Sequence, residues 1–345
     1  MSPSGPGLVE KFDCIDVLSV WGTISMFSLA ELRDAADFVH QYVAPTPTIQ
    51  WPMLDRATGL SLYVKHENHT RLGAFKIRGG LTFCRYLGTS VEVNRGLISA
   101  TRGNHGQSLA HAASRFGMAA TIIVPHGNSV EKNAAMRAWG AEVIEHGDDF
   151  QEAAEYAFSY ASRTDLVMVP PFHRELVRGV ASYGLELFDD IKRLDRVYVP
   201  VGMGSGICSL ITARDALGLK TEIIGVVAKG ADAVRQSFIA GKVIQTPSAK
   251  TFADGVACRS PDAAAFEIIK AGAADIVAVD DDQIATAMRL YFSSCHTLAE
   301  GAGALPLAAA MVDRDENIGK KVALILTGAN IDRADYARIL SGEDK

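Results

Sequence analysis

The feature that most restricts the fold of this chain is a regular alternation of short apolar runs with longer amphipathic ones from about residue 96 onward. In NHGQSLAHAASRFG, residues 104–117, Leu109, Ala113 and Phe116 recur at the three- and four-residue spacing of one helix face. Strands that alternate with helices are joined by right-handed crossovers, which produce mainly parallel sheets covered by helices on both faces. The pattern therefore predicts an α/β fold.

Two series of such elements can be read along the chain. The first has strands at 95–100, 118–125, 141–145 and 165–170, with helices at 104–117, after Ser129 and at 149–163. The second has helices at 175–192 and 206–217, with strands at 196–201, 221–227 and 320–326. Ser129 and Asp148 are the expected N-caps, because their oxygens can accept from first-turn amides. The irregular region 228–265 is expected to cross between domains.

Two series predict two α/β domains with a cleft between them, which agrees with 345 residues at about 100–200 residues per domain. We expect residues 1–92 and 173–345 to form the large domain and residues 93–172 the small one.

Composition excludes several classes of protein. Apolar residues make up 48% and charged residues 21%, as in a globular enzyme, and the net charge of −6 disfavours nucleic acid as a partner. No apolar run approaches the roughly 18–20 residues of a membrane span, and MSPSGPGLVEKFD lacks the apolar core of a signal peptide. The cysteines show no CxxC spacing, which favours reduced thiols. We therefore expect a soluble, cytoplasmic protein without a membrane partner; its cysteines are Cys14, Cys84, Cys208, Cys258 and Cys295.

The stretch GAFKIRGG, residues 73–80, sets Lys76 between Phe75 and Ile77 and among glycines. An apolar setting favours the neutral amine, which is the form that reacts as a nucleophile or base. We expect the glycines to leave room for a ligand beside Lys76. A solvated surface lysine next to a glycine turn is the alternative.

The turn PVGMGSGICS, residues 200–209, directly follows an expected strand. Glycines there let the backbone approach a ligand, and the next helix directs its amides at an anion. The turn lacks the GK[ST] of a Walker loop, and its G-x-G-x-G differs from the dinucleotide motif. It predicts a phosphate site, with a plain tight turn as the alternative.

Three further turns carry polar side chains. SATRGNHGQS (99–108) sets Asn104 and His105 in a first helical turn, where they can meet a carboxylate or simply form a turn. Glu300 is the only charged residue in LAEGAGAL (298–305), where it could simply cap a helix. Thr327 ends a strand in LILTGAN (324–330), where it could simply belong to a turn. A reactive lysine, a phosphate site and a polar turn together are what pyridoxal phosphate requires.

On these segments the chain resembles the fold-type II pyridoxal phosphate enzymes, and within them the threonine/serine dehydratase and serine racemase group. The resemblance runs from APTPTIQWPML (44–54) to LTGANI (326–331) and includes LYVKHENHTRLGAFKIRGG (62–80) and TFADGVA (251–257). It implies a tryptophan synthase beta-like fold with a large cofactor-binding domain, a small domain that carries the substrate loop, and a homodimer.

The resemblance also implies roles for single residues. Lys76 would be the Schiff-base and catalytic lysine, with Phe75 packed on the cofactor ring. Ser205 would be a catalytic residue that holds the cofactor phosphate, which is the candidate acid for the leaving hydroxyl. The remaining implied cofactor contacts are Asn104, Gly202, Met203, Gly204, Gly206, Glu300 and Thr327, the last beside the ring nitrogen. The implied substrate-binding loop consists of Thr101, Arg102, Gly103, Asn104 and His105.

Two departures from the family pattern bear on activity. Arg102 stands where racemases often have a small hydroxyl residue, and because an arginine stays protonated, racemisation is disfavoured. Arg102 could bind an extra acidic group of the substrate, point to solvent or pair with a structural carboxylate. VVAKGADA, after the strand at 221–227, lacks the glutamate of the family's divalent metal site, so no metal is assigned.

The resemblance implies a dehydratase, an ammonia-lyase that converts L-threonine or L-serine into a 2-oxo acid and ammonia. The alternatives are a dehydratase for a bulkier or acidic 3-hydroxy amino acid, namely phenylserine or 3-hydroxyaspartate, a racemase, or a non-catalytic module that binds the cofactor. His66, His173 and His296 are candidates for choosing the substrate, with structural roles as the alternative.

Overall fold

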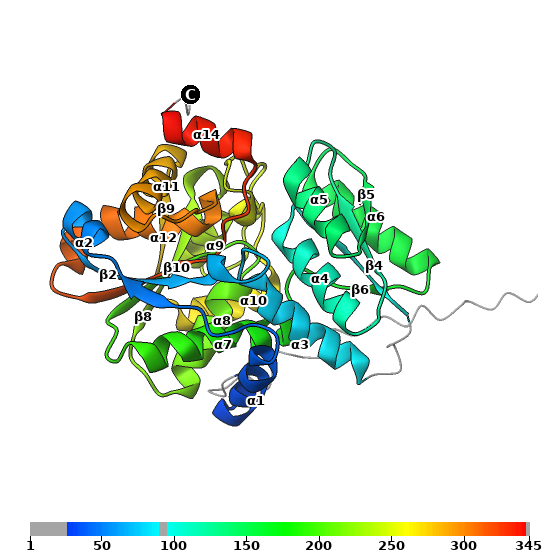
Figure 1. Cartoon of the computed structure of the whole chain (residues 1–345), viewed down its shortest axis with the longest axis horizontal. Coiled ribbons are helices and arrows are strands. Elements are labelled where there is room, and N and C mark those ends of the chain that lie inside the picture. The colour runs from blue at the N-terminus through cyan, green and yellow to red at the C-terminus, as the bar shows by residue number, and fades with distance from the viewer. Residues whose placement is uncertain (1–25, 90–94, 343–345) are drawn as a thin grey trace, which may run out of the picture.

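The computed structural model describes residues 26–89 and 95–342, which contain two sheets flanked by helices (Figure 1). The larger sheet has the order β1-β2-β10-β7-β8-β9. Only β1 is antiparallel to its neighbour; all other pairs are parallel. Its strands are β1 (Thr48–Gln50), β2 (Ser61–His66), β7 (Arg196–Pro200), β8 (Glu222–Ala228), β9 (Asp275–Val279) and β10 (Lys321–Leu326).

The smaller sheet has the order β5-β4-β3-β6 and is parallel throughout. Its strands are β3 (Leu97–Ala100), β4 (Ala120–Val124), β5 (Glu142–Glu145) and β6 (Val167–Met168). The helices α4 (Asn104–Arg115), α5 (Val130–Ala138) and α6 (Phe150–Arg163) gather around it (Figure 1).

The helices of the larger sheet lie on both of its faces. The register pairs Leu324 with Val64 and Tyr198, and these side chains share one core with α11 and α12. The neighbouring Ala323 and Val197 point to the other core, with α1, α7 and α8. These helices are α1 (Leu29–His40), α2 (Pro52–Thr58), α7 (Arg174–Asp190), α8 (Ser205–Ala216), α9 (Ala233–Ala240), α10 (Ala263–Gly272), α11 (Asp281–Cys295), α12 (Gly301–Val312), α13 (Arg314–Asn317) and α14 (Arg333–Ser341).

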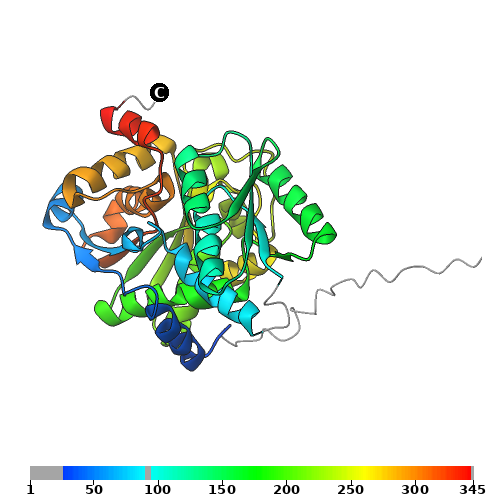
Figure 2. The same ribbon diagram turned by 45° about the vertical axis from the view of Figure 1, so that its right-hand side comes forward.

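Helix α3 (Lys76–Gly88) connects the two parts, because it packs against α4 on one side and α7 on the other. The turned view in Figure 2 shows α3 running beneath the smaller sheet and its helices. Short 3₁₀ turns complete the chain at Glu67–His69, Lys229–Ala231 and Asp254–Val256.

The expected α/β class with mainly parallel sheets is confirmed, and the expected strands and helices form with small shifts at their ends. The expected strand at 165–170 is shorter, since only Val167–Met168 pairs with β3. The predicted cap Asp148 is wrong: α6 begins at Phe150, so Asp149 occupies the N-cap and accepts from the amide of Glu152. Ser129 caps α5 as predicted.

The expectation that region 228–265 crosses between domains stays a prediction, and its Asp254 pairs with Lys132 of α5 at 3.3 Å. The strands before and after it, β8 and β9, are neighbours in the larger sheet, so the chain returns to the sheet it left. The domain limits at residues 92–93 and 172–173 stay a prediction. In the part of the chain described, no helix has the length and apolarity needed to cross a membrane. Cys84, Cys208, Cys258 and Cys295 are free thiols, and Cys14 lies outside the described residues.

Candidate active site

Lys76 is the first residue of α3, and the backbone before it is fixed to the end of β10. The amide of Phe75 donates to the carbonyl of Thr327 at 3.0 Å, and the amide of Ala329 donates to the carbonyl of Gly73 at 2.9 Å. Gly73 has a φ of +65°, which a glycine adopts without strain. The lysine therefore lies directly beside the end of a buried parallel strand.

The Lys76 side chain is half-buried, and its Nζ lies 3.3 Å from the hydroxyl of Ser205 and 4.8 Å from the centre of the Phe75 ring. Burial lowers the pKa of this amine to about 8, although the nearby Glu300 carboxyl opposes the shift. This rules out the solvated surface lysine that the sequence left open.

The expectation that the glycines of GAFKIRGG leave room beside Lys76 is wrong for Gly79 and Gly80. A β-carbon on Gly79 would meet the Leu176 carbonyl oxygen of α7 at 2.8 Å. On Gly80 it would meet the Ser108 hydroxyl of α4 at 2.3 Å. Their space is filled by helix packing, so these glycines position α3 and not a ligand.

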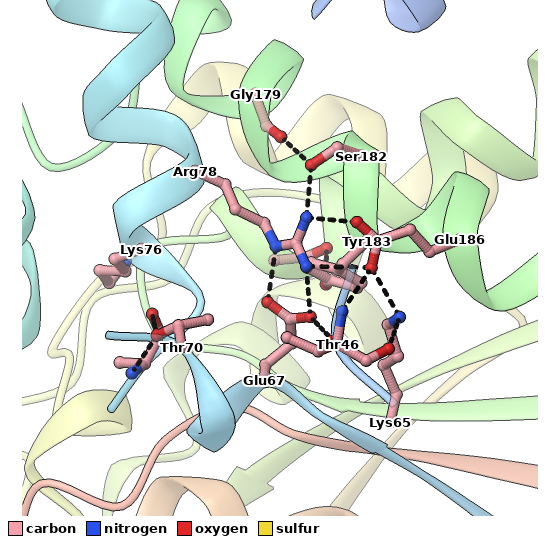
Figure 3. A network of polar contacts seen from close by, with 12 residues as sticks. Thr46, Lys65, Glu67, Thr70, Lys76, Arg78, Gly179, Ser182, Tyr183 and Glu186 are labelled. Atoms are coloured by element: carbon pink, nitrogen blue, oxygen red, sulfur yellow. Dashed lines mark hydrogen bonds and ion pairs between the residues drawn. The ribbon is translucent and has the colours of Figure 1, made fainter. Parts of the chain in front are cut away.

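Arg78 extends from α3 away from Lys76, into a buried ion network (Figure 3). Its Nε lies 2.8 Å from Glu67, and its Nη1 lies 2.6 Å from Glu186. Lys65 of β2 contacts the other oxygen of Glu186 at 2.6 Å. The network joins β2, α3 and α7, and it thereby fixes the beginning of the helix that carries Lys76.

The predicted phosphate turn lies between β7 and α8. Gly204 has a φ of +99° and occupies the N-cap of α8, and no side chain caps the helix. The first hydrogen bond of α8 joins the Cys208 amide to the Gly204 carbonyl, so the amides of residues 205–207 have no acceptor among the described residues. Free amides next to the half-buried Lys76 fit an anionic group.

Asn104 connects the loop 101–105 to residues that belong to the part of the chain around the larger sheet. Its Nδ2 donates to Glu300 Oε1 at 2.6 Å, and its Oδ1 accepts from Asn330 Nδ2 at 2.8 Å. Glu300 occupies the N-cap of α12, but its side chain does not cap that helix. Burial raises the pKa of Glu300, while the charge of Lys132 opposes the shift. These contacts favour a role in the site for Asn104 and Glu300 over the plain turn and the helix cap that were their alternatives.

Lys132 and Asp254 are site residues that the sequence reasoning did not single out. Lys132 Nζ lies 3.3 Å from Asp254 and 3.7 Å from Glu300, so it links α5 to the larger sheet's side of the site. Asp254 belongs to the TFADGVA segment used for the resemblance, which was the available signal. Lys132 lies three residues after Ser129, the correctly predicted cap of α5, but no sequence motif around it indicates a place in the site.

A cavity of about 100 Å³ lies beside Lys76. Its walls include the predicted Met203 and Glu300 and the whole loop 101–105, together with Lys132 and Asp254. The predicted Gly202, Gly204, Ser205 and Gly206 form the α8 turn, which Ser205 joins to Lys76. Thr101 accepts hydrogen bonds from the amides of Gly103 and Gly106, so its hydroxyl shapes the loop.

A larger cavity of about 510 Å³ lies elsewhere, at the amino ends of β7 and β8. Lys192, Lys220 and Glu222 are among its walls, and it contains none of the predicted site residues. In α/β folds the carboxyl ends of parallel strands carry the chemistry, so the smaller cavity is the candidate site.

The three histidines considered for substrate choice have structural contacts. His66 accepts from the indole of Trp51 at 3.0 Å, and His173 accepts from the Glu175 amide as the N-cap of α7. His296 ends α11 with a φ of +49°. None of them lines the cavity beside Lys76. Within the described residues, no three His, Cys, Asp or Glu side chains are grouped to hold a metal ion.

Comparison with known proteins agrees with this geometry. The family model of the pyridoxal-phosphate dependent enzymes matches residues 39–328, and the chain therefore belongs to this family. Its cofactor is pyridoxal 5'-phosphate, and its fold is the expected fold-type II architecture.

Individual relatives cover nearly the whole chain. An L-threonine ammonia-lyase of Thermotoga maritima is 33% identical over 317 residues, which are 92% of this chain and 79% of the relative. An L-threo-3-hydroxyaspartate ammonia-lyase of Saccharomyces cerevisiae is 29% identical, over 91% and 96% of the two chains. The solved structure of a T.th. threonine deaminase superposes with a TM-score of 0.83 at 31% identity, covering 89% of this chain and 99% of that one.

Proposed function

We propose that the protein is a pyridoxal phosphate-dependent ammonia-lyase that converts an L-3-hydroxy amino acid, threonine or serine, into a 2-oxo acid and ammonia by α,β-elimination. The observation that carries the proposal is the half-buried Lys76 amine, whose pKa is lowered to about 8 and which lies 3.3 Å from Ser205 at an uncapped helix N-terminus. The names of the ammonia-lyase relatives support the same reaction.

The proposed cofactor site uses residues from both sides of the cavity. Lys76 would hold the cofactor covalently, and Phe75 would pack beside its ring. The phosphate would receive hydrogen bonds from the uncapped amides of α8 and would be surrounded by Gly202, Met203, Gly204, Ser205 and Gly206. The ring would be contacted by Asn104, Glu300 and Thr327, with Thr327 as the partner of its nitrogen.

The proposed substrate site is the loop of Thr101, Arg102, Gly103, Asn104 and His105 at the N-terminus of α4. The Thr101 hydroxyl already receives the amides of Gly103 and Gly106. The amides of Asn104 and His105 therefore remain for the substrate's α-carboxylate.

When bound, the cofactor withdraws electrons from the substrate's α-carbon and so makes its proton acidic. Lys76 takes that proton, because its lowered pKa provides a neutral amine near neutral pH. Ser205 lies within hydrogen-bonding distance of the Lys76 amine and can pass a proton to the leaving β-hydroxyl. Asn104 is held at both ends of its amide, by Glu300 and Asn330, which keeps the loop and Lys76 in register.

Elimination is favoured over racemisation for two reasons. Thr327 offers a neutral hydroxyl, which would not hold the ring nitrogen of the cofactor protonated as a carboxylate would. Arg102, on the loop, stays protonated and is a poor proton shuttle for the opposite face of the substrate. Interconversion of serine enantiomers would contradict this assignment.

The second candidate is a dehydratase for a bulkier or acidic 3-hydroxy amino acid, such as phenylserine or 3-hydroxyaspartate. The name of the 3-hydroxyaspartate relative and the presence of Arg102 in the cavity wall support it. A non-catalytic module that binds the cofactor is the remaining candidate, and release of any 2-oxo acid would exclude it.

The test is a screen for 2-oxo acid release across serine, threonine isomers, phenylserine and 3-hydroxyaspartate, with and without magnesium. We expect release from at least one L-isomer. Lys76→Ala should lower turnover by at least about 1000-fold and remove the cofactor's lysine-bound visible absorption. Retained turnover in Lys76→Ala would show that another residue carries the chemistry.

We further propose two domains, residues 1–92 with 173–345 and residues 93–172, a homodimeric assembly and a cytoplasmic location. The two separate sheets support the domain limits. The absence of a membrane-spanning helix in the described residues is compatible with the location. Light scattering of the purified protein tests the dimer, and cell fractionation tests the location.

A further inference from the structure

We propose that Arg102 binds a second anionic group on the substrate, so that the preferred substrate is a 3-hydroxy amino acid with a carboxylate side chain, such as 3-hydroxyaspartate. This inference rests on the proposed ammonia-lyase function and, between the two candidate substrate classes, selects the acidic 3-hydroxy amino acid over threonine and serine.

Arg102 lies in the wall of the cavity beside Lys76, and its Nε is buried without a hydrogen-bond partner. No carboxylate among residues 26–89 and 95–342 forms an ion pair with it. A buried guanidinium N–H without an acceptor is unfavourable, because the group has lost water and gained nothing in exchange. A structural ion pair does not fit these observations, and the half-buried side chain has its Nε shielded from water.

The other nitrogen groups of the cavity already have their partners or carry no charge. Lys132 is paired with Asp254 and Glu300. His105 is neutral at physiological pH, because burial lowers its pKa to about 3. Lys76 is assigned to the cofactor. Arg102 is therefore the one cation of the described cavity wall that is left for a substrate anion.

The cofactor's phosphate and the substrate's α-carboxylate are two further anions, and both have proposed positions away from Arg102. The proposed phosphate site is the uncapped end of α8 next to Ser205, and the proposed α-carboxylate site is the N-terminus of α4. A third anion on the substrate would supply the partner that Arg102 Nε lacks among the described residues. The planar guanidinium fork matches a carboxylate at two oxygens.

Arg102 and Lys76 line the same small cavity, which has a volume of about 100 Å³. A short acidic side chain fits a cavity of this size better than a long one would.

Binding is measured first, with the holoenzyme and two amino acids that lack a β-hydroxyl and so do not undergo the elimination. L-Aspartate and L-asparagine have nearly the same shape and differ in charge, and each is titrated by the change in the cofactor's visible absorbance. We expect wild type to bind aspartate at least about tenfold more tightly. In Arg102→Gln the preference should fall by roughly 10- to 100-fold.

Turnover is then compared for 3-hydroxyaspartate and 3-hydroxyasparagine. The ratio of their kcat/KM values should favour the acid in wild type, fall in Arg102→Gln mainly through KM, and recover in part in Arg102→Lys, which keeps the charge without the fork. Arg137→Gln is the matched control, because Arg137 lies on the exposed side of α5 and its partner among the described residues is Glu145, at 3.8 Å. It should keep the wild-type ratio.

Equal losses for the acid and the amide in Arg102→Gln would overturn the proposal and assign Arg102 to the α-carboxylate or the phosphate. An absent preference in wild type would overturn it as well. A preference for aspartate that depends on Arg102, in a protein that releases no 2-oxo acid from any substrate, would support the role of Arg102 and refute the proposed elimination.

Discussion

Burial changes the two ionisable groups nearest the reacting centre in opposite directions. It lowers the pKa of the Lys76 amine and raises the pKa of the Glu300 carboxyl, and in both cases it favours the neutral form. Lys132 opposes the shift of Glu300, and Glu300 opposes that of Lys76. The site therefore keeps a lysine that is near its titration midpoint at physiological pH.

This shift predicts how the cofactor-free protein captures pyridoxal phosphate. Only the neutral amine attacks the aldehyde, and with a pKa of about 8 roughly a tenth of Lys76 is neutral at pH 7. The capture rate, followed by visible absorbance, should rise through pH 8 and level off above it. Lys76→Ala should show no such signal, and a rate that keeps rising to pH 10 would mean an unshifted lysine.

At the residue scale the sequence predicted the groups whose neighbours lie close along the chain. Lys76 was recognised from Phe75 and Ile77 beside it, and Asn104 from its position at a helix start. Lys132 and Asp254 meet across 122 positions of sequence, and no local pattern encodes that contact. Arg102 was noticed, but its lack of an ion-pair partner among the described residues depends on the three-dimensional positions of distant carboxylates.

At the level of elements, α3 connects the two halves of the molecule through close backbone contacts. The sequence correctly predicted the alternating strands and helices, because apolar periodicity is local. It misjudged Gly79 and Gly80, because their neighbours Leu176 and Ser108 belong to helices far along the chain. The pairing order of the strands likewise followed only from the folded structure.

The packing of α3 predicts a strong position dependence for glycine replacement. In Gly80→Ala the new methyl would lie 2.3 Å from the Ser108 hydroxyl, so the helices must separate, and we expect a loss of about 1–3 kcal/mol in the free energy of unfolding. Gly88→Ala is the control in the same helix: its nearest contact is 3.8 Å, and alanine should stabilise by up to about 1 kcal/mol. Urea denaturation measures both, and equal effects would contradict the packing argument.

At the scale of the whole molecule, the ion network behind Lys76 ties together segments of both sequence halves (Figure 3). Glu186 of α7 accepts from Arg78 of α3, Lys65 of β2 and the amide of Thr46. Its carboxylate has low exposure, so each of these partners depends on it for compensation. The position of the reactive lysine thus depends on contacts that never touch a ligand.

This network predicts acid sensitivity of the fold. Burial alone would raise the pKa of Glu186, but the charges of Arg78 and Lys65 outweigh it and lower the pKa to about 2. A carboxyl whose pKa is depressed on folding stabilises the protein above its unfolded pKa near 4.5, and this contribution disappears as the pH falls towards 2. Glu186→Gln should be less stable than wild type by about 3–5 kcal/mol at pH 7, because it leaves buried cations uncompensated.

The gap between wild type and Glu186→Gln should therefore narrow steadily from about pH 5 downward. Denaturant unfolding at pH 7, 5, 4 and 3 measures it. Glu267→Gln serves as the control, because the partner of Glu267 in the described chain is the exposed Lys270 of its own helix, and the change should alter stability by less than about 1 kcal/mol at every pH. A gap for Glu186→Gln that stays constant with pH would show that the network stabilises the fold through packing alone and not through the charge of this carboxylate.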